Sequence, residues 1–428
     1  MWRRTYSLTK HRFGLGFLRR SFSSERSGKR FVALWGNGDY GRLGLGTLDS
    51  QWTPAVCNAL QNKTLQSIAC GGAHTLFLTD DGCVYATGLN DCGQLGISEG
   101  KQYLMEPVRV LGDDKKIMHV AAGYNHSCAI TVDGELYMWG KNTSGQLGLG
   151  KKAPNIVPLP TKVEHLDGIR IKMTALGIIR TFEFDLKEYF SCFYWVLQYG
   201  GEAFSWGMGG SGRLGHGHES GILGLFKSYS EYTPRLIKDL EGVKVKYIAA
   251  GLLNSACIDE NGFVYIFGER GIDKLHLKEM SNATKPSLIN ELPYSQQVAC
   301  GGYHTCVLTN SGELYTWGSN ENGCLGIGSP DAIHLPEKVR GPFLRSSVSQ
   351  VSCGWKHTAA ISEGRVFTWG WGGSYGTFSE VGHSSAGQLG QGTDVDYINP
   401  TRVCFGEEVK ALQISCGFNH TGAILEYT

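Results

Sequence analysis

The chain has 428 residues, 41% of them hydrophobic, and carries 40 Lys and Arg against 39 Asp and Glu. This balance argues against general phosphate binding, and the lack of an apolar run of 18 residues argues against a membrane-spanning helix. Thirteen cysteines, an odd number with no secretory signal before them, argue against a complete disulfide framework.

Residues 1–22 contain six Lys or Arg and no acidic residue, with aromatic and leucine side chains between them. This composition is typical of a mitochondrial transit peptide, and Arg20, three residues before Ser23, predicts cleavage near Phe22 and Ser23. The alternative is a disordered basic tail, such as a nuclear signal. We expect residues 23–29 to form a linker. Without residues 1–22, 34 basic residues face 39 acidic ones.

A short phrase then recurs seven times, each copy an aromatic-rich run that closes on Gly and usually on Trp-Gly. The closing residues are Gly36, Gly88, Gly140, Gly207, Gly268, Gly318 and Gly370. Their intervals are 52, 52, 67, 61, 50 and 52 residues, so one unit is repeated, with insertions in the middle of the chain. Self-similarity at such a period is typical of repeat architectures.

Each unit also has an internal order. A G-[QR]-L-G turn such as Gly41–Gly44 follows the phrase, then a Pro, then the motif [AC]-G-x-x-H-[ST]. Asp81-Gly82 and its equivalents lie between two β-rich runs, which is a hairpin signal. Seven such units without helical periodicity predict an all-β, seven-bladed propeller.

The two ends of the repeat region complement each other. The last unit stops at residues 420–428, without the Trp-Gly run that follows His126 in the second unit. The missing run stands at Arg30–Gly36. We therefore expect the N- and C-terminal strands to share one blade of a single propeller over residues 30–428, which hides two sheet edges.

One copy is broken. Gly177 and Gly201 are 24 positions apart, whereas Gly123 and Gly134 in the intact unit are 11 apart, and the His motif has become Gly-Ile-Ile-Arg-Thr at residues 177–181. We expect an atypical insertion at about residues 177–200. Two origins fit its composition: a translated retained intron with an acceptor site before Tyr199, or a genuine lineage-specific loop. Sequencing the transcript distinguishes them.

These phrases resemble the regulator of chromosome condensation repeat family over nearly all of residues 31–427, and most of all its plant mitochondrial, exchange-factor-like branch. The resemblance implies the propeller fold. The founding nuclear member is a nucleotide exchange factor for a small GTPase, and mitochondrial members are associated with organellar RNA maturation and respiratory-complex biogenesis. A plant branch senses ultraviolet light through repeated G-W-[RK]-H-T motifs. Only Gly354–Thr358 fits that motif here, so no coupled tryptophan cluster is expected.

The recurring histidines and tryptophans are the most conspicuous candidate residues. Catalysis requires one site, whereas these residues recur in most units, so we expect buried imidazoles that bond turn backbone and tryptophans that fill the core. We therefore assign no catalytic residue. The residues concerned are His74, His126, His304, His357, His420, Trp35, Trp139, Trp206, Trp317 and Trp369.

The cysteines and glycines give no sign of a cofactor. Cys70, Cys300, Cys353 and Cys416 occupy one repeat position, so we expect them in different blades, too far apart to share a metal, as small buried hydrophobes. The Gly-rich turns lack G-K-[ST] and open no helix. We therefore expect neither a metal nor a bound nucleotide.

Two further insertions are candidate partner-binding loops. Residues 217–233 and 371–386 are longer than their counterparts in other units, and long loops on a rigid propeller often bind partners. Passive surface loops are the alternative. The candidate contact residues are Phe226, Lys227, Tyr229, Tyr232, Trp371, Tyr375 and Phe378.

Together these features predict a monomeric, non-enzymatic scaffold of the mitochondrial matrix. It would bind protein partners and support organellar RNA processing, especially intron splicing, and through it respiratory complex I biogenesis. The alternatives are a guanine nucleotide exchange factor for a mitochondrial small GTPase and a protein that binds RNA directly.

Overall fold

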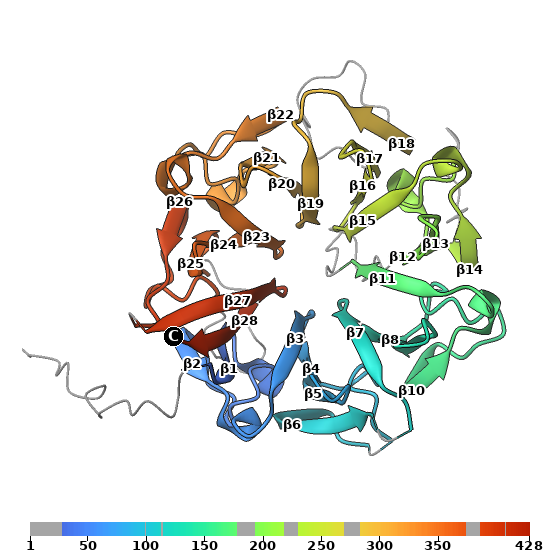
Figure 1. Cartoon of the computed structure of the whole chain (residues 1–428). Helices are drawn as coiled ribbons and strands as arrows, with labels where there is room; N and C mark the ends of the chain where they lie inside the picture. Colours follow the sequence, from blue (N-terminus) through green and yellow to red (C-terminus); the bar gives the residue numbers. More distant parts are fainter. Residues whose placement is uncertain are drawn as a thin grey trace, which may run out of the picture.

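The computed structural model describes residues 28–98, 100–112, 114–177, 193–217, 230–268, 283–373, 386–406 and 408–428. Their strands form seven four-stranded antiparallel sheets arranged in a ring (Figure 1). The predicted seven-bladed β-propeller is therefore confirmed. In this part of the chain no helix has the length and apolar character needed to cross a bilayer.

Each blade has its innermost strand at the centre of the ring and its outermost strand at the rim (Figure 1). From centre to rim, blade 1 contains β3 (Leu65–Cys70), β4 (His74–Thr79), β5 (Val84–Leu89) and β6 (Tyr103–Leu111). Blade 2 contains β7 (Ile117–Ala122), β8 (His126–Thr131), β9 (Leu136–Lys141) and β10 (Ile156–Lys162). Blade 3 contains β11 (Ile171–Leu176), β12 (Phe193–Gln198), β13 (Ala203–Met208) and β14 (Ser230–Leu236).

The remaining blades follow the same order. Blade 4 contains β15 (Val245–Ala250), β16 (Asn254–Asp259), β17 (Val264–Gly268) and β18 (Ala283–Ile289). Blade 5 contains β19 (Ser295–Cys300), β20 (His304–Thr309), β21 (Leu314–Gly318) and β22 (Ile333–Lys338). Blade 6 contains β23 (Val348–Cys353), β24 (His357–Ser362), β25 (Arg365–Gly370) and β26 (Tyr397–Arg402). Blade 7 contains β27 (Val409–Cys416), β28 (His420–Tyr427), β1 (Arg30–Gly36) and β2 (Gln51–Val56).

Blade 7 closes the ring. The N-terminal strand β1 pairs with the C-terminal strand β28 in antiparallel register, from Arg30 opposite Glu426 to Gly36 opposite His420. The strand order β2-β1-β28-β27 confirms that the two ends of the repeat region share one blade. Because β1 has a partner on each side, closure leaves neither terminal strand with its inner edge unpaired.

Blade 3 corrects the expected position of the broken repeat. Strand β12 lies inside the expected insertion, and Phe193 faces Gly207 as His126 faces Gly140 in blade 2. The repeat therefore resumes at Phe193 rather than at Gly201. Phe193 holds the histidine position instead of Arg180, which lies outside the described residues.

The physical reason is apolar burial in β12. Tyr194, Trp195, Val196 and Leu197 are all at most 1% exposed, so this run supplies the buried second strand that the blade needs. Phe193–Gln198, which the sequence predicts to belong to an inserted intron product or loop, are thus part of the sheet. The excess over the repeat length falls in residues 178–192, which lie outside the described residues.

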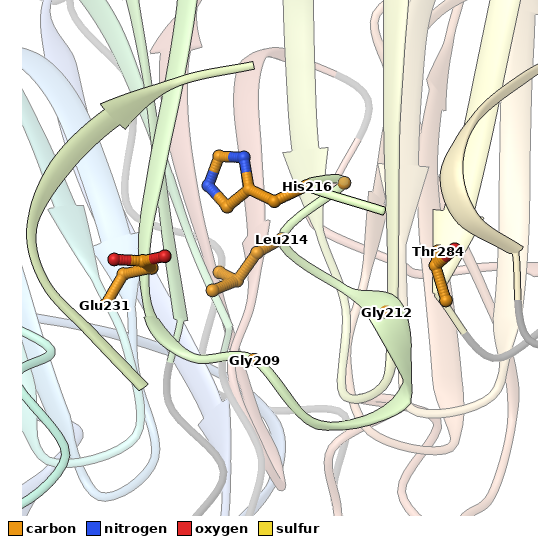
Figure 2. Close-up of a pocket in the computed structure, with 7 residues that line it drawn as sticks. Gly209, Gly212, Leu214, His216, Glu231 and Thr284 are labelled. Atoms are coloured by element: carbon orange, nitrogen blue, oxygen red, sulfur yellow. The ribbon is translucent and has the colours of Figure 1, made fainter. Parts of the chain in front are cut away.

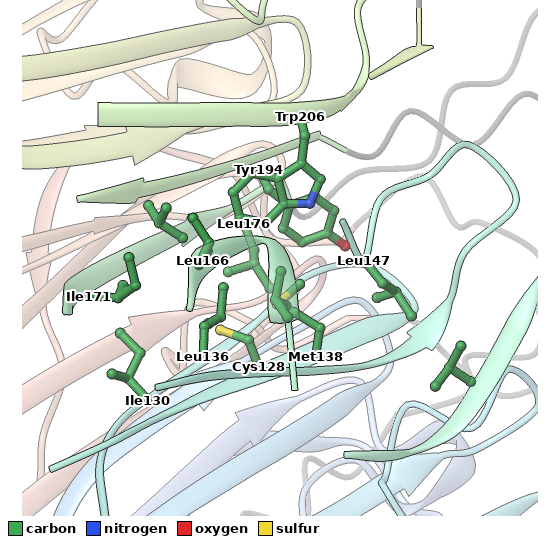
Figure 3. Packing of buried hydrophobic residues seen from close by; sticks show 13 residues of the cluster. Cys128, Ile130, Leu136, Met138, Leu147, Leu166, Ile171, Leu176, Tyr194 and Trp206 are labelled. Carbon is green, nitrogen blue, oxygen red and sulfur yellow. The ribbon is translucent and has the colours of Figure 1, made fainter. Parts of the chain in front are cut away.

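The hydrophobic core lies between blades rather than inside them. Figure 3 shows Ile130, Leu136 and Met138 of blade 2 packed toward Leu176 and Trp206 of blade 3. A single four-stranded sheet has no second layer to cover its faces, so each blade buries its apolar side chains against its neighbours. The stability of one blade therefore depends on the next.

We predict that Leu34→Ala in β1 lowers the free energy of unfolding by about 2–5 kcal/mol, because a fully buried leucine leaves a cavity when truncated. Leu34 is 0% exposed and belongs to the cluster of Leu60 and Phe77, which joins blade 7 to blade 1. Urea unfolding measures the loss. The control Leu335→Ala removes a 62% exposed side chain of β22 and should cost less than about 0.5 kcal/mol. Equal losses would contradict a special role for the closing strand.

Candidate protein-binding face and the ring beneath it

A backbone carbonyl in the turn after the third strand accepts two hydrogen bonds from the next blade. Gln94 O accepts from Ser127 Oγ at 2.8 Å and from Trp139 Nε1 at 2.9 Å. The same pair of bonds recurs at Gln388 O, with Thr421 Oγ1 at 2.8 Å and Trp35 Nε1 at 2.9 Å. The recurring tryptophans are thus buried, and most bond the preceding blade: Trp35, Trp139, Trp206 and Trp369 at 0% and Trp317 at 6% exposure.

The recurring histidines extend these contacts around the ring. Each bonded histidine begins the second strand of its blade and reaches the hydroxyl of the next blade. Since that hydroxyl donates its proton to the turn carbonyl, we assign the Nε2–H tautomer, in which the imidazole donates to the hydroxyl oxygen. The pairs are His420 with Thr75 (3.0 Å), His74 with Ser127 (2.9 Å), His304 with Thr358 (2.9 Å) and His357 with Thr421 (3.0 Å). Asn254 takes the histidine position in blade 4 and donates to Thr305 at 2.9 Å.

The two junctions that flank blade 3 lack this bond among the described residues. Opposite His126, Tyr194 occupies the position that holds Ser or Thr in the other blades. The two rings meet edge-on with centroids 4.7 Å apart. Neither ring nitrogen of His126 has a hydrogen-bond partner in the described structure. Phe193 has no nitrogen to offer Ser255 of blade 4. At this second junction Trp195 of blade 3 packs on Phe267 of blade 4 with ring centroids 4.5 Å apart, so each junction has an aromatic contact.

Burial keeps the ring histidines neutral. Desolvation lowers the pKa of His74 and of His357 to about 3, and holds the pKa of His126 and His420 well below the usual range. A base with so low a pKa is a poor proton acceptor at neutral pH. The imidazoles of His74, His357 and His420 therefore act as neutral hydrogen-bond donors, whereas the neutral ring of His126 packs against Tyr194.

An aromatic cluster lies next to this circle of inter-blade hydrogen bonds, at the centre of one face of the propeller. Trp355 stacks on Phe418 with centroids 4.5 Å apart and planes at 11°, and Tyr124 meets Phe418 edge-on at 5.7 Å. Leu252 and Phe418 are buried, while Tyr124, Tyr303 and Trp355 are half-buried and packed against them. These residues, here called the central cluster, occupy the variable positions of the G-x-x-H loops.

Glycines at two of the same positions make room for the rings. A Cβ on Gly72 would lie 2.5 Å from Tyr124 O and 2.8 Å from Tyr124 Cδ2. A Cβ on Gly302 would meet Trp355 O at 2.5 Å and Trp355 Cδ1 at 2.7 Å. Each of these glycines thus leaves room for the aromatic residue of the next loop, which fixes where that side chain lies.

The cationic side chains beside the central cluster, Lys356, Arg42 and Arg213, all bond acceptors within the protein, Arg213 through Leu252 O at 3.2 Å. Lys356 Nζ lies 4.8 Å from the centroid of the Trp355 ring and donates to Glu321 Oε2 at 2.7 Å. Arg42 is buried, and its guanidinium donates to Asn419 Oδ1 at 2.7 Å and to Gly72 O at 3.3 Å. The centre of this face is therefore an aromatic surface whose neighbouring cations are held by hydrogen bonds within the protein.

The long loops leave the blades on this same face. In an antiparallel blade, the connections from first to second strand and from third to fourth strand share one side. The residues that precede the four longest internal undescribed segments, Gly177, Gly217, Gly268 and Gly373, all stand at such connections. This face therefore carries both the central cluster and the main length variation of the chain.

The structure describes two of the seven predicted partner-binding residues, Tyr232 and Trp371. Phe226, Lys227, Tyr229, Tyr375 and Phe378 lie outside the described residues. Tyr232 is half-buried on β14, where its ring packs over the Gly145 turn and lies 5.8 Å from Lys151 Nζ. Trp371 is only 4% exposed and meets Trp355 edge-on at 5.6 Å. Its ring supports the central cluster and offers little open surface to a partner.

A pocket near blades 3 and 4 was not anticipated from the sequence. Figure 2 shows Leu214, His216, Glu231 and Thr284 around it, with Gly209, Gly212 and Gly215 completing the wall. His216 Nε2 lies 3.0 Å from Ser205 Oγ, but that hydroxyl is buried and donates to Leu214 O at 2.7 Å. Because the serine proton is committed to a backbone carbonyl, this pair does not form an activated nucleophile.

Cys70, Cys300, Cys353 and Cys416 end the innermost strands of four different blades and are buried. The twelve described cysteines are free thiols. The thirteenth, Cys192, lies outside the described residues.

Comparison with known families decides the assignment of the chain. Residues 31–423 match the model of the RCC1-like domain. The chain belongs to the RCC1-like domain family. It is 32% identical over 370 residues to the ultraviolet-B receptor UVR8 of Arabidopsis thaliana, with 85% of this chain and 76% of the receptor covered.

Two further similarities bear on this RCC1-like chain. It is 32% identical over 317 residues to the mitochondrial RCC1 domain-containing protein RUG3 of Arabidopsis thaliana, with 72% of this chain and 65% of that protein covered. The crystal structure of human WBSCR16 has a TM-score of 0.76 and 23% identity, with 93% of this chain and 99% of that chain covered. The latter similarity supports the fold alone.

We predict that Thr421→Val lowers the free energy of unfolding by about 1–3 kcal/mol. Valine has a similar shape but removes the acceptor of His357 and one of the donors to Gln388 O, and leaves a buried N–H unpaired. Thermal and urea unfolding measure the change. Thr401→Val is the matched control and should change little, since the Thr401 hydroxyl donates to Asn399 O within its own half-exposed edge strand β26.

We also predict that stability falls on acidification from about pH 6.5 toward pH 3. The folded pKa values of His74 and His357 lie below the unfolded value of about 6.5. The unfolded chain therefore binds more protons, and each such histidine costs about 1.4 kcal/mol of stability per pH unit in that window. Unfolding free energies measured across this range test the slope.

His357→Asn should flatten that slope, because asparagine already fills the equivalent position as Asn254 and does not titrate. If His357→Asn and the parent chain had the same slope, the buried imidazole would not be the titrating group.

Proposed function

We propose that this RCC1-like propeller is a non-enzymatic scaffold of the mitochondrial matrix. Through its protein partners it would support organellar RNA processing, especially intron splicing, and through it respiratory complex I biogenesis. The observation that carries the scaffold proposal is the half-buried central cluster on the face from which the long loops leave.

The chemistry of that face favours a protein partner. Tyr and Trp are enriched in the cores of protein interfaces, where their rings bury large areas at small entropic cost. Trp355, Tyr124 and Tyr303 offer such surface, held in place by the ring below. Direct RNA binding would instead require clustered positive charge. Lys356 is paired with Glu321, and the chain without residues 1–22 has more acidic than basic groups.

The proposed location and process rest on sequence. Residues 1–22 have the basic, acid-free composition of a transit peptide. The similar protein RUG3 is named mitochondrial. Splicing and complex I biogenesis come from the resemblance to mitochondrial members of the family, and they belong to the same proposal.

Nucleotide exchange on a mitochondrial small GTPase is the second candidate. Membership of the RCC1-like domain family favours it, because the founding member of that family is an exchange factor. Exchange requires a segment of the propeller to enter the nucleotide site of the GTPase. It therefore predicts faster nucleotide release, whereas a scaffold leaves release unchanged.

We predict that Trp355→Ala weakens partner binding by about 2 kcal/mol or more, roughly thirty-fold in affinity, because a central aromatic residue is removed from the interface. The measurement is quantitative immunoprecipitation of the tagged chain from isolated mitochondria, with organellar transcripts sequenced from cells that carry only the variant. Trp52→Ala, which removes a half-buried tryptophan at the rim of blade 7, is the control.

Loss of RNA-processing partners with accumulation of unspliced precursors, in Trp355→Ala but not Trp52→Ala, would support the scaffold. Normal transcripts with a GTPase as the main partner, and faster nucleotide release from that GTPase, would support exchange. Unchanged partner capture by folded Trp355→Ala would show that the central cluster is not the binding surface.

A further inference from the structure

Three buried side chains with metal-binding atoms meet at the junction of blades 5 and 6. His304 and Cys306 are two residues apart on β20, so both point to the same side of the strand. Cys353 ends β23 of the next blade. One ligand atom from each of the three lies within 4.8 Å of the others. The side chains are 1%, 0% and 5% exposed.

The repeat shows that this combination is specific to one junction. The three positions are the first residue of a second strand, the residue two further on, and the last residue of the next blade's innermost strand. Only blades 5 and 6 place a His or Cys at all three. The equivalent sets are His74, Leu76, Ala122; His126, Cys128, Leu176; Phe193, Trp195, Ala250; Asn254, Ala256, Cys300; His357, Ala359, Cys416; and His420, Gly422, Cys70.

The glycine in one of these sets confirms that the positions face each other. A Cβ placed on Gly422 of blade 7 would lie 3.2 Å from Cys70 Sγ of blade 1. The corresponding pair at the junction of blades 5 and 6 is Cys306 and Cys353. Their proximity thus follows from the geometry of the ring, and the sequence decides which side chains occupy it.

We propose that His304, Cys306 and Cys353 form a binding site for Zn²⁺ between blades 5 and 6. Two thiols and an imidazole are the soft and borderline ligands that zinc prefers. Donor atoms around a tetrahedral zinc ion lie roughly 3.5–4 Å apart, so a spacing of at most 4.8 Å needs a contraction of no more than about 1.3 Å. Three protein ligands leave the fourth position to a non-protein ligand.

Charge balance selects a divalent ion. Binding would convert both thiols into thiolates and release two protons, and two thiolates with a neutral imidazole give a zinc site of zero net charge. A neutral site suits this buried position, where an uncompensated charge would be costly. Cu⁺, which shares the preference for sulfur, would leave a net negative charge with the same ligands.

The surroundings fit this chemistry. Both thiols have polar neighbours: Cys306 Sγ lies 3.6 Å from Thr316 Oγ1, and Cys353 Sγ donates to Ala299 O at 3.6 Å. His304 Nε2 bonds Thr358 Oγ1, whereas its Nδ1 has no hydrogen-bond partner in the described part of the chain. One imidazole lone pair is therefore uncommitted. The site is independent of the proposed scaffold function.

The test uses the purified full chain, reduced with a non-chelating reductant and stripped with EDTA. Zn²⁺ alone is added, excess ion is removed, and bound zinc is measured by mass spectrometry. We expect one equivalent per chain, and a thiolate-to-cobalt charge-transfer band when Co²⁺ replaces Zn²⁺. Cys306→Ala and Cys353→Ala should each weaken binding by more than about ten-fold. Cys416→Ala, at the same repeat position as Cys353 in another junction, should bind as the parent does.

His304→Asn keeps the result interpretable if a cysteine variant fails to fold. Asn254 fills this position in blade 4 and bonds Thr305, so asparagine is compatible with the ring. Loss of zinc from folded His304→Asn supports the site. Absence of stoichiometric zinc in the parent chain, equal zinc in all variants, or tight binding of Cu⁺ without Zn²⁺ would overturn the assignment.

Discussion

The contact between adjacent blades depends on a turn carbonyl of one blade that accepts two hydrogen bonds from side chains of the next. At Gln388 O, for example, a threonine hydroxyl and a tryptophan N–H of the next blade both donate, and a neutral histidine donates to that hydroxyl. Each donor or acceptor in this set has its hydrogen-bond partner within the set, and all of these groups are buried away from bulk water. Because a buried unpaired donor costs about 1–3 kcal/mol, the loss of one member also penalises the others.

This arrangement separates what holds the ring from what varies on its surface. The histidine and hydroxyl residues of each G-x-x-H-[ST] loop point into the junctions, while the variable residues lie on the face. Trp355, Phe418 and Tyr124 can therefore form a central cluster without changing any bond of the ring. A rigid frame below a variable aromatic patch suits a binding surface, because few side chains must be ordered when a partner arrives.

The seven blades and their closure were predictable because the repeated turns, the Trp-Gly runs and the missing last strand are all visible in the sequence. The position of β12 was not, since Phe193 had replaced the histidine that marks the second strand elsewhere. The burial of Trp371 against Trp355 and the meeting of Cys306 with Cys353 were missed for another reason. Both depend on which residues of different units face each other in space.

In blade 3, aromatic packing takes the place of the histidine-to-hydroxyl hydrogen bonds that join the other blades. Among the described residues both of its junctions lack the imidazole-to-hydroxyl bond, yet Tyr194 meets the ring of His126, and Trp195 packs on Phe267 of blade 4 with centroids 4.5 Å apart. These rings fill the space that a smaller polar residue would leave, and such aromatic pairs contribute about 0.5–1.5 kcal/mol beyond their buried area. Bulk on β12 thus compensates for the lost bonds. The blade can consequently accept extra sequence between β11 and β12 without opening the ring.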